Sequence, residues 1–427
     1  MIQRLLQLVL INLKPCRLNL SFFIAKRIAF NKQKSFSRFI IRITVFATAL
    51  SVAGMILALS FVNGFQHSIS EKIFNFWGHI RVQHFELGKS LVAEEVPIKQ
   101  NDTIVSIISS FYEVKKVQSF ATKSAVIEFN KNIEAVLFKG VNEQYDFKNL
   151  QPFLQKGRWV QFFDSSYQKE IVISEYHANL LEIKISDTIL IHFINSAEGK
   201  SNSRKLLVCG IYKTGIEEYD KLFGIGDIRL IRRLSNWNEN EIGGYEVFLK
   251  DYKNLEKVNN AIYDKMPNAW ISRSMKEIFP NIFDWLNIQD VNRNVIIIIM
   301  SLVAIINMIS CLLILVLERT RMTGILKAFG SDEKTIQKIF FYYASYIATT
   351  GVFIGFIAGV GISLLQLYTG FIKLDEAAYY VATAPIFINW LEVMIVCMGA
   401  LLLCFISLLL PLYITRKIKP IKAIQFR

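Results

Sequence analysis

Four long stretches of the chain consist almost entirely of apolar residues. They cover residues 39–62, 295–317, 339–367 and 388–414, and the second contains the unbroken apolar run Val295 to Met300. A helix needs about 20 mostly apolar residues to cross a membrane, because lipid offers the backbone no hydrogen-bonding partners. A buried helix of a soluble protein would explain any one stretch. Four together predict a membrane protein with four transmembrane α-helices.

The long segment between the first and second spans has a different pattern. Short runs rich in Val, Ile and aromatic residues predict strands at 80–85, 125–129, 135–141, 170–174, 188–193, 205–212 and 244–249. Amphipathic patterns predict helices at 102–112, 175–181 and 255–265. We therefore expect a large mixed α/β domain, of one or two subdomains, inserted between spans 1 and 2. The apolar pattern continues at both flanks of this domain, which predicts that the first two spans extend as a stalk.

The formal net charge is +14, and its location decides between a nucleic-acid partner and a membrane topology. Residues 1–38 and the tail 415–427 contain Lys and Arg but no acidic residue, and the loop around 319–338 is also basic. The long insert is nearly balanced in sign. Basic residues collect on the cytoplasmic side of membrane proteins. We therefore expect both termini to be cytoplasmic, the α/β domain to be extracytoplasmic, and no nucleic-acid partner.

These patterns predict a complete domain plan. Residues 19–38 alternate apolar runs with basic residues, as an interfacial helix on anionic headgroups does. In chain order we expect a cytoplasmic segment with this elbow helix (1–38), span 1 (39–66), the extracytoplasmic domain (67–290), span 2 (291–317), a cytoplasmic helix (318–338), span 3 (339–367), a short outer loop (368–387), span 4 (388–414) and a cytoplasmic tail (415–427). Residues 1–13 resemble a short signal segment without a cleavage site, and we expect a membrane-surface segment or an overlong start.

No catalytic or metal site is evident in the sequence. Only Cys209 of the five cysteines falls in the insert, so no disulfide framework is expected there. The five histidines have no metal-ligand spacing, and no phosphate-cradling GxxxxGK[ST] loop or hydrolase motif occurs. We expect no cofactor, no enzymatic activity and no ATP site in this chain. The spans carry no ionisable residue near mid-depth, which disfavours a proton-coupled transporter.

The third span contains a stripe of small residues at a spacing of four: Gly351, Gly355 and Gly359. Such a stripe lets helix backbones approach closely. We interpret it as tight packing within one subunit in preference to a dimer contact.

The segment from Glu318 to Gly330 is the most informative part of the chain. Its apolar residues Met322, Ile325, Leu326 and Phe329 share one helical face. We expect Gly330 to end this helix, Ser331 to cap the next one, and Asp332 and Glu333 to lie in that helix's first turn. The pattern predicts a short amphipathic helix at the cytoplasmic surface. It would either rest on lipid or dock a soluble partner.

This helix, followed by Ile336 and Phe340, resembles the coupling helix of the FtsX/MacB-type ABC-transporter permeases. Other segments resemble the LolC/LolE lipoprotein-releasing branch of that family, in the right order along the chain. They are the elbow sequence 21–27, an Asn63-Gly64-Phe65 turn closing the first span, the region 170–191 with Ser186-Asp187-Thr188, the tract 210–220, and the P-x-x-A-[IL]-type ending at 419–424.

The resemblance implies a division of labour. A separate cytoplasmic ATPase dimer would bind ATP and Mg²⁺ and dock on this chain, two identical or related permease subunits would pair, and force would pass along the first two spans to the outer domain. The residues that would couple to the ATPase are Glu318, Arg319, Arg321, Met322, Ile325, Leu326, Lys327, Phe329 and Gly330.

The resemblance also implies a cargo. In the lipoprotein-releasing branch, acylated proteins leave the inner membrane between the first two spans and pass to a soluble periplasmic carrier. Burying each CH₂ group of an acyl chain gains ~0.8 kcal/mol. The residues expected along this path are Met55, Leu59, Val62, Asn63, Phe65, Val295, Ile299 and Val303, for which lipid contact or helix packing is the alternative.

One segment departs from the family pattern. Members that recruit the carrier use a protruding hairpin with proline, whereas Asn195–Arg204 is short, polar and lacks proline.

A lipoprotein-releasing permease of the cell inner membrane is the first hypothesis. A division-type FtsX regulator of a cell-wall hydrolase and a MacB-type drug or peptide exporter remain alternatives, because fold alone does not settle function. The size of the insert favours the first over the division type.

Overall fold

The computed structural model describes residues 20–29, 36–86, 94–163, 167–195, 200–409 and 411. The contacts divide the chain into two units. The helical unit comprises Met1–Gly64, Gln289–Gly370 and Ile386–Arg427, and the α/β unit comprises Phe65–Ile288 and Phe371–Pro385. The expected features at residues 1–18, 415–427 and 419–424 lie outside the described residues.

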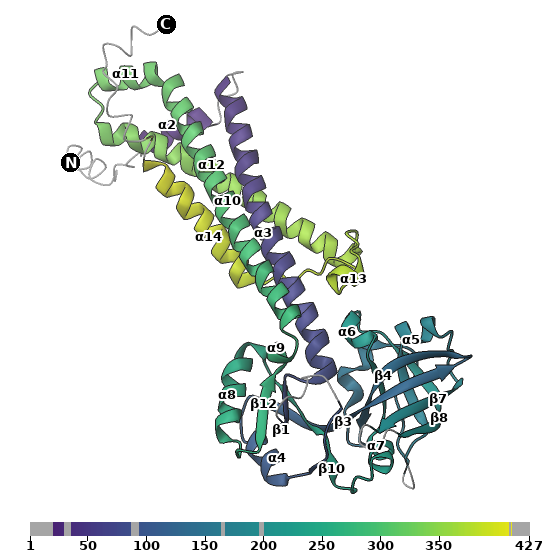
Figure 1. Ribbon diagram of the computed structural model, residues 1–427. Coiled ribbons are helices and arrows are strands. Elements are labelled where there is room, and N and C mark those ends of the chain that lie inside the picture. Colours follow the sequence, from purple (N-terminus) through teal and green to yellow (C-terminus); the bar gives the residue numbers. More distant parts are fainter. Residues whose placement is uncertain are drawn as a thin grey trace, which may run out of the picture. The chain divides into compact units, whose positions relative to one another are not determined.

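Four helices are long and apolar enough to cross a membrane: α3 (Phe36–Trp77), α10 (Pro280–Glu318), α12 (Glu333–Thr369) and α14 (Trp390–Ser407) (Figure 1). They coincide with the four predicted spans. Two short helices complete the helical unit, α2 (Leu20–Ala29) before the first span and α11 (Thr320–Ala328) between the second and third. Helix α2 lies against the start of α12, where Ser21 Oγ donates to the carbonyl of Thr335 at 3.2 Å.

Helices α3 and α10 are much longer than a membrane span. At ~1.5 Å per residue, the 42 residues of α3 extend over ~63 Å, whereas the hydrocarbon core of a bilayer is ~30 Å thick. The predicted extension of both spans is therefore present. The predicted turn at Asn63-Gly64-Phe65 is wrong, because α3 passes through these residues without a break. Gly64 is buried there, and tertiary packing overrides the local turn preference of Asn-Gly.

The glycine stripe of α12 packs against α3 inside this one chain. A Cβ atom on Gly355 would lie 2.6 Å from the carbonyl oxygen of Ala49, and one on Gly351 would lie 2.9 Å from Cβ of Thr48. A Cβ on Gly359 would similarly crowd Ile56. The glycines therefore allow the close approach of the two helices, as the intrasubunit interpretation predicts.

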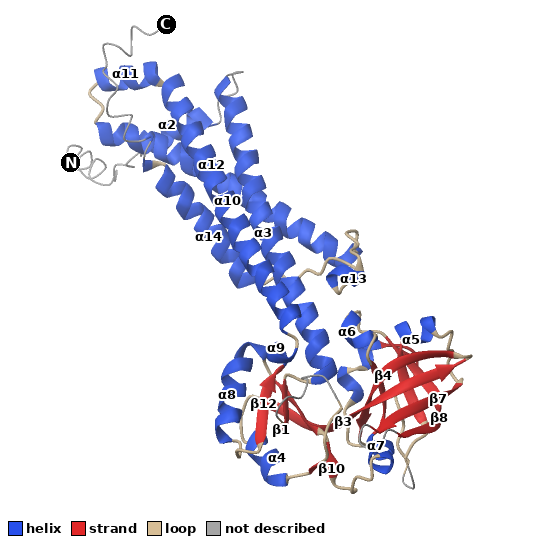
Figure 2. Cartoon of the chain, viewed as in Figure 1, coloured by secondary structure: helices blue, strands red, loops and turns tan. Residues whose placement is uncertain are grey.

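One part of the α/β unit is a four-stranded antiparallel sheet in the order β12-β1-β11-β3 (Figure 2). Its strands are β1 (Ile80–His84), β3 (Val114–Phe129), β11 (Gly244–Leu249) and β12 (Trp270–Ser274). Helices α4 (Asp102–Ser109) and α8 (Leu255–Lys265) pack on it with their buried apolar residues. A separate pair joins β2 (Ile98–Lys99) to β10 (Glu241–Ile242), and α9 (Met275–Ile278) follows β12.

The second part is a closed ring of six strands. Strand β3 continues into β4 (Asn132–Val141), and the pairing proceeds through β9 (Phe223–Asp227), β6 (Glu170–Ser174), β8 (Lys200–Tyr212) and β7 (Thr188–Asn195) back to β3. Side chains fill so small a barrel, and Phe138 and Phe193 meet edge to face within it. Strand β5 (Leu154–Gly157) extends β8, and short helices α5 (Glu175–Leu180), α6 (Glu217–Asp220), α7 (Ile228–Leu234) and α13 (Glu376–Tyr379) complete the unit.

All seven predicted strands and all three predicted helices of the insert are present, although β3 begins eleven residues before its predicted start. The sequence pattern missed β2, β5, β9, β10, β12 and residues 114–124 of β3. The strand β3 begins at Val114, but its first residues include Lys115, Lys116 and Gln118, which hide the apolar alternation.

Candidate functional site

Helix α11 presents one exposed face, which we call the α11 surface. It consists of Arg321 and Ile325 on α11, Glu318 at the end of α10 and Phe329 at the C-cap of α11, and the Phe329 side chain is 86% exposed. A phenyl ring in this position gains nothing from the fold of its own chain. The exposed apolar residues beside two charged ones fit a helix that docks into a groove of another protein.

The end of α11 is fixed by its backbone. Gly330 adopts a left-handed φ of +85°, Gly330 N–H donates to Lys327 O at 3.0 Å, and Ser331 N–H donates to Leu326 O at 2.9 Å. These two bonds form a Schellman motif, for which glycine is the best residue. The predicted cap at Ser331 is wrong, because Asp332 occupies the N-cap of α12 and makes no side-chain capping bond. This hydrogen-bonded turn sets the direction in which Phe329 emerges.

The predicted apolar stripe of α11 divides between two sides of the helix. Leu326 packs against the buried cluster formed by α2, α10 and α12, and Met322 is half-buried. Arg319 and Lys327 are also partly covered, and Lys327 Nζ lies 3.7 Å from Glu333 Oε1. Only part of the predicted coupling set is therefore available to a partner, namely the α11 surface with Gly330 at its end.

A polar cluster links three of the long helices near one end of their apolar segments. Asn63 Nδ2 on α3 donates to Glu392 Oε2 on α14 at 2.6 Å, and Arg293 on α10 donates to Asn63 Oδ1 at 3.4 Å. Asn389 donates to the other Glu392 oxygen at 2.9 Å, and Arg293 pairs with Asp290 at 2.9 Å. Each charged group of this partly exposed cluster therefore has a partner.

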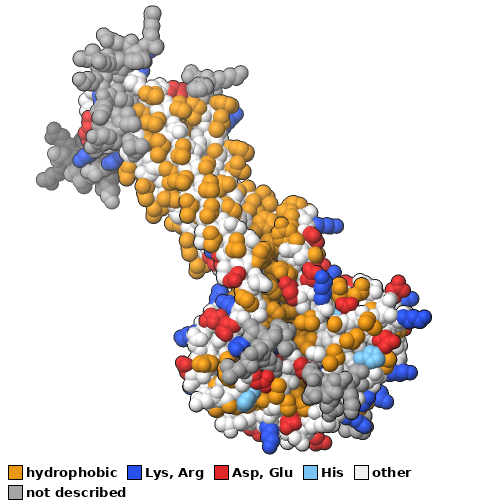
Figure 3. Space-filling view, in the orientation of Figure 1, with side chains coloured by type: hydrophobic (Ala, Val, Ile, Leu, Met, Phe, Trp, Pro, Cys, Tyr) orange, Lys and Arg blue, Asp and Glu red, His pale blue; other side chains and the backbone are white. Residues whose placement is uncertain are grey.

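The residues predicted to line a cargo path do not form a single groove in this chain. Met55, Leu59 and Val62 of α3 are buried by helix packing, and Phe65 packs edge to face on Trp285. The α10 residues Val295, Ile299 and Val303 are instead exposed, at 47%, 51% and 45%. The α3 residues thus follow the packing alternative. Figure 3 shows the broad apolar surface of the helices on the face in view.

The carboxyl end of α3 is held in the core of the α/β unit by a fully buried lysine. Lys139 Nζ donates to the carbonyl of Phe76 at 2.8 Å and pairs with Glu246 Oε1 at 2.6 Å. It also lies 4.0 Å from the centre of the Trp77 ring. A cation at a helix carboxyl end neutralises the partial negative charge of the last carbonyls. Lys139 therefore caps α3 electrostatically.

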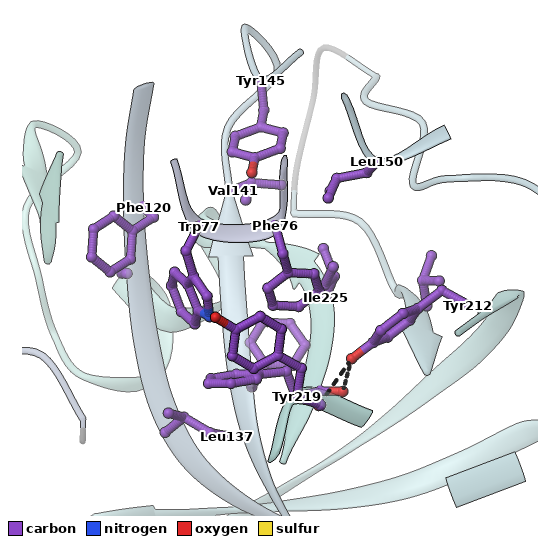
Figure 4. Packing of buried hydrophobic residues seen from close by; sticks show 14 of the residues in the cluster. Phe76, Trp77, Phe120, Leu137, Val141, Tyr145, Leu150, Tyr212, Tyr219 and Ile225 are labelled. Atoms are coloured by element: carbon purple, nitrogen blue, oxygen red, sulfur yellow. Dashed lines mark hydrogen bonds between the residues drawn. The ribbon is translucent and has the colours of Figure 1, made fainter. Parts of the chain in front are cut away.

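Figure 4 shows the aromatic residues Phe120, Tyr145 and Tyr219 near Phe76 and Trp77 at this helix end, and charged side chains add to them. The Arg81 guanidinium stacks over Trp77 at 4.3 Å and over Phe120 at 4.9 Å, and it pairs with Glu95 at 3.7 Å. Tyr145 Oη donates to Glu246 Oε2 at 3.2 Å. Cation–π contacts are strongest where water is excluded, as it is here.

Burial controls the protonation of this cluster. Desolvation lowers the pKa of Lys139 to about 8 despite its contact with Glu246, so the ammonium is still largely protonated at neutral pH. Burial raises the pKa of Tyr145 well above its usual value, which keeps the phenol a hydrogen-bond donor. Sequence reasoning missed Lys139 and Glu246. The signal was one charged residue inside each of the two apolar runs 135–141 and 244–249.

Two of the histidines, His79 and His177, have structural positions in the α/β unit. His79 stacks on Phe74 at 4.3 Å, and the buried His177 shares a 2.8 Å hydrogen bond with Ser174. Among the described residues, no group of three or more His, Cys, Asp or Glu side chains is placed to hold a metal ion. The tip of the β7–β8 hairpin, at the expected position of a carrier-binding hook, lies outside the described residues.

Comparison with known proteins identifies two family models in chain order. The MacB-like periplasmic core domain matches residues 43–264, and the FtsX-like permease C-terminal model matches residues 294–420. Together these matches cover most of the α/β unit and most of the helices that follow it.

Whole-chain relatives extend the match. The lipoprotein-releasing system transmembrane protein LolE of Haemophilus influenzae is 22% identical over 425 residues, covering 96% of this chain and 100% of that protein. The LolC protein of the same organism is 21% identical over 403 residues, covering 92% and 94%. Among solved structures, the periplasmic region of MacB from Actinobacillus actinomycetemcomitans matches 48% of this chain and 91% of that one, with 14% identity and a TM-score of 0.31.

Proposed function

The chain belongs to the FtsX-like permeases that carry a MacB-like periplasmic core domain, and we propose that it is the membrane subunit of an ABC transporter that extracts lipoproteins from the inner membrane. A separate ATPase subunit would drive the extraction, and the cargo would move on toward the outer membrane. The LolE and LolC relatives, which match nearly the whole chain, are lipoprotein-releasing permeases, and they support this choice of cargo.

The observation that carries the proposal is the continuity of α3 and α10. Each helix contributes residues to the helical unit and to the α/β unit without an interruption. An unbroken helix transmits displacement along its axis better than a helix with a hinge, since its hydrogen-bonded backbone resists compression. This construction suits a transporter that uses ATP to move an extracytoplasmic domain.

The α11 surface is the proposed docking site for the ATPase. It lies between two spans, it is exposed, and it joins α10 to α12 through a tightly hydrogen-bonded turn. A push on Phe329 would therefore reach both helices. This role requires the α11 surface and both chain termini to be cytoplasmic, in accord with the basic flanks.

The exposed apolar face of α10 is the proposed contact for the acyl chains of the cargo. Acyl chains gain ~0.8 kcal/mol for each CH₂ group that leaves water. Val295, Ile299 and Val303 offer such a surface, and the polar cluster around Asn63 would mark the level at which the cargo's protein part begins. A second permease subunit, identical or related, would complete the path.

Release of lipoproteins from vesicles is the direct test. The permease is reconstituted with its ATPase in proteoliposomes that carry an acylated lipoprotein, and soluble lipoprotein is measured after ATP is added. We expect ATP-dependent release of acylated cargo and no release of a variant whose lipid-bearing Cys is replaced by Ser. In cells, depletion should retain lipoproteins at the inner membrane.

Two outcomes would count against the proposal. Unchanged lipoprotein sorting after depletion would exclude the release function. If depleted cells instead fail to separate after division while lipoprotein sorting stays normal, the division-type hypothesis is favoured.

A further inference from the structure

The connection between α12 and α14 folds onto the α/β unit. Residues Phe371–Pro385 group with that unit by their contacts, although the helices before and after them belong to the helical unit. Leu374 N–H donates to Ala382 O at 2.9 Å and Ala384 N–H donates to Ile372 O at 3.0 Å, which closes a small hairpin. Its Val381 side chain is buried in the core of the α/β unit. We call this segment the 371–385 hairpin.

Two lysines of the α/β unit hold the hairpin. Lys213 Nζ, at the end of β8, lies 2.8 Å from Glu376 Oε2 and 3.3 Å from Glu175 Oε2. Lys72 Nζ, on α3, donates to the carbonyl of Tyr380 at 2.7 Å. The hairpin is thus tied both to the β-sheet and to the carboxyl part of α3.

The loop after β8, which contains Thr214 and Gly215, has a fixed backbone and leaves space for the hairpin. The buried Asp220 carboxylate accepts hydrogen bonds from Thr214 Oγ1 at 2.8 Å and from Gly215 N–H at 2.9 Å, which fixes the loop after β8. Gly215 has a φ of +73°, and a Cβ there would lie 2.5 Å from Glu376 Oε1 and 2.7 Å from Lys72 Nζ. A glycine at this position leaves the room in which the hairpin and Lys72 meet.

Aromatic contacts add a third attachment. Tyr380 adopts a left-handed φ of +61°, its hydroxyl donates to Glu218 at 3.3 Å, and its ring meets Trp285 of α10 edge to face at 6.1 Å. Tyr379 packs near Phe65 of α3 with ring centres 6.4 Å apart. The hairpin therefore contacts the α3, α10 and β8 elements of the α/β unit.

We propose that the 371–385 hairpin is a latch that ties α12 to the α/β unit and so gives ATPase-driven movement a second route, besides α3 and α10. The latch rests on the proposed function, because α12 is the helix that directly follows the α11 surface. Its ion pair is partly exposed, with 37% of the Lys213 side chain and 30% of that of Glu376 accessible. Contacts of this kind can break and re-form during a cycle more easily than the fully buried Lys139–Glu246 contact.

Substitution of Lys213 in the complete complex, reconstituted with its ATPase in nanodiscs, tests the latch. We expect Lys213→Met to lower cargo-stimulated ATPase activity by about fivefold, the size typical of a lost coupling contact, with basal ATPase activity unchanged. Lys213→Arg keeps the charge and should keep the stimulation. Lys116→Met is the matched control, since Lys116 has the same exposure and pairs with Asp146 far from the hairpin in sequence.

Hydrogen–deuterium exchange of peptides covering residues 371–385 supplies a readout that does not depend on cargo. Lys213→Met should speed exchange in the hairpin, and Lys116→Met should not. Faster hairpin exchange with unchanged cargo stimulation would overturn the latch, as would unchanged exchange. If the unmodified complex shows no cargo stimulation at all, the proposed function fails. The latch hypothesis is then tested by comparing hydrogen–deuterium exchange of residues 371–385 with and without ATP. An ATP-dependent change in exchange supports the latch, and unchanged exchange overturns it.

Discussion

Single buried charges explain how the α/β unit holds the end of α3. Lys139 has no exposed surface, yet its ammonium reaches a helix carbonyl, a carboxylate and an aromatic ring. Removing only one partner of such a pair leaves the other charge buried and costs several kcal/mol, on the order of 3–5. The arrangement therefore depends on Lys139 and Glu246 being present together. No local sequence signal reports this pairing, because the two residues lie on strands far apart in the chain.

The buried histidines make the α/β unit sensitive to acid. Burial lowers the pKa of His177 to about 4, against 6.5 for an exposed histidine. Between pH 4 and pH 6.5, His177 is protonated in the unfolded chain but neutral in the folded chain. The free energy of unfolding therefore decreases as the pH falls from 6.5 to 4, by ~1.4 kcal/mol per pH unit. We predict that His177→Asn flattens this dependence while lowering stability at pH 7.

The measurement for His177 is the thermal unfolding midpoint of the full chain in detergent, taken at several pH values. His79, whose pKa burial also lowers to about 4, stays in both proteins and contributes equally to each. The same slope in wild type and His177→Asn would therefore show that His177 does not titrate as described.

The sequence predicts helices and strands well where buried apolar residues recur at a regular spacing. The four spans and the strands of the insert have apolar periods that burial imposes directly on the sequence. The predictions failed where distant packing decides, as at Asn63-Gly64-Phe65, where a turn-forming sequence continues as helix. For the candidate site, the α11 segment was found from its amphipathic period. Period alone did not show that Leu326 faces the bundle and Phe329 faces out, nor that Lys213 meets Glu376.

The two sides of α11 predict different effects for two similar substitutions. Phe329→Asp places a charge on the exposed α11 surface and should abolish cargo-stimulated ATPase activity, with little change in the thermal stability of the permease. Leu326→Asp buries an unpaired carboxylate against the α2–α10–α12 cluster and should lower the amount of folded permease as well.

Both α11 variants are compared by ATPase assay of the assembled complex and by thermal unfolding of the permease. Full cargo stimulation in Phe329→Asp would rule out the α11 surface as the docking site. Equal loss of stability in both variants would contradict the division of α11 into an inner and an outer side.

At the scale of the whole molecule, α3 is a single unbroken helix that contributes residues to both units. One Ala inserted after His67 would rotate everything beyond it by ~100° and shift it by ~1.5 Å along the axis. We predict that this insertion abolishes lipoprotein release while the chain still enters the membrane, because it changes the helical phase along α3 between Val52 and Ile56, which are buried in the helical unit, and Ile69, Ile73 and Trp77, which are buried in the α/β unit.

One Ala inserted between Asn130 and Lys131, in the β3–β4 turn, is the control for the α3 insertion and should leave most release intact, since surface turns tolerate added residues. Release is measured in the proteoliposome assay. Full release by the α3 insertion would show that a bend can replace a continuous helix.

The glycine stripe of α12 is covered by α3 of the same chain. Gly351, Gly355 and Gly359 face α3 at distances that leave no room for a methyl group. A neighbouring permease therefore cannot use these glycines as the seam of a pair. A two-subunit assembly would have to use other surfaces, and among the four spans the apolar segment of α10 has the largest exposed share. A packing detail inside one chain thus restricts how two chains can meet.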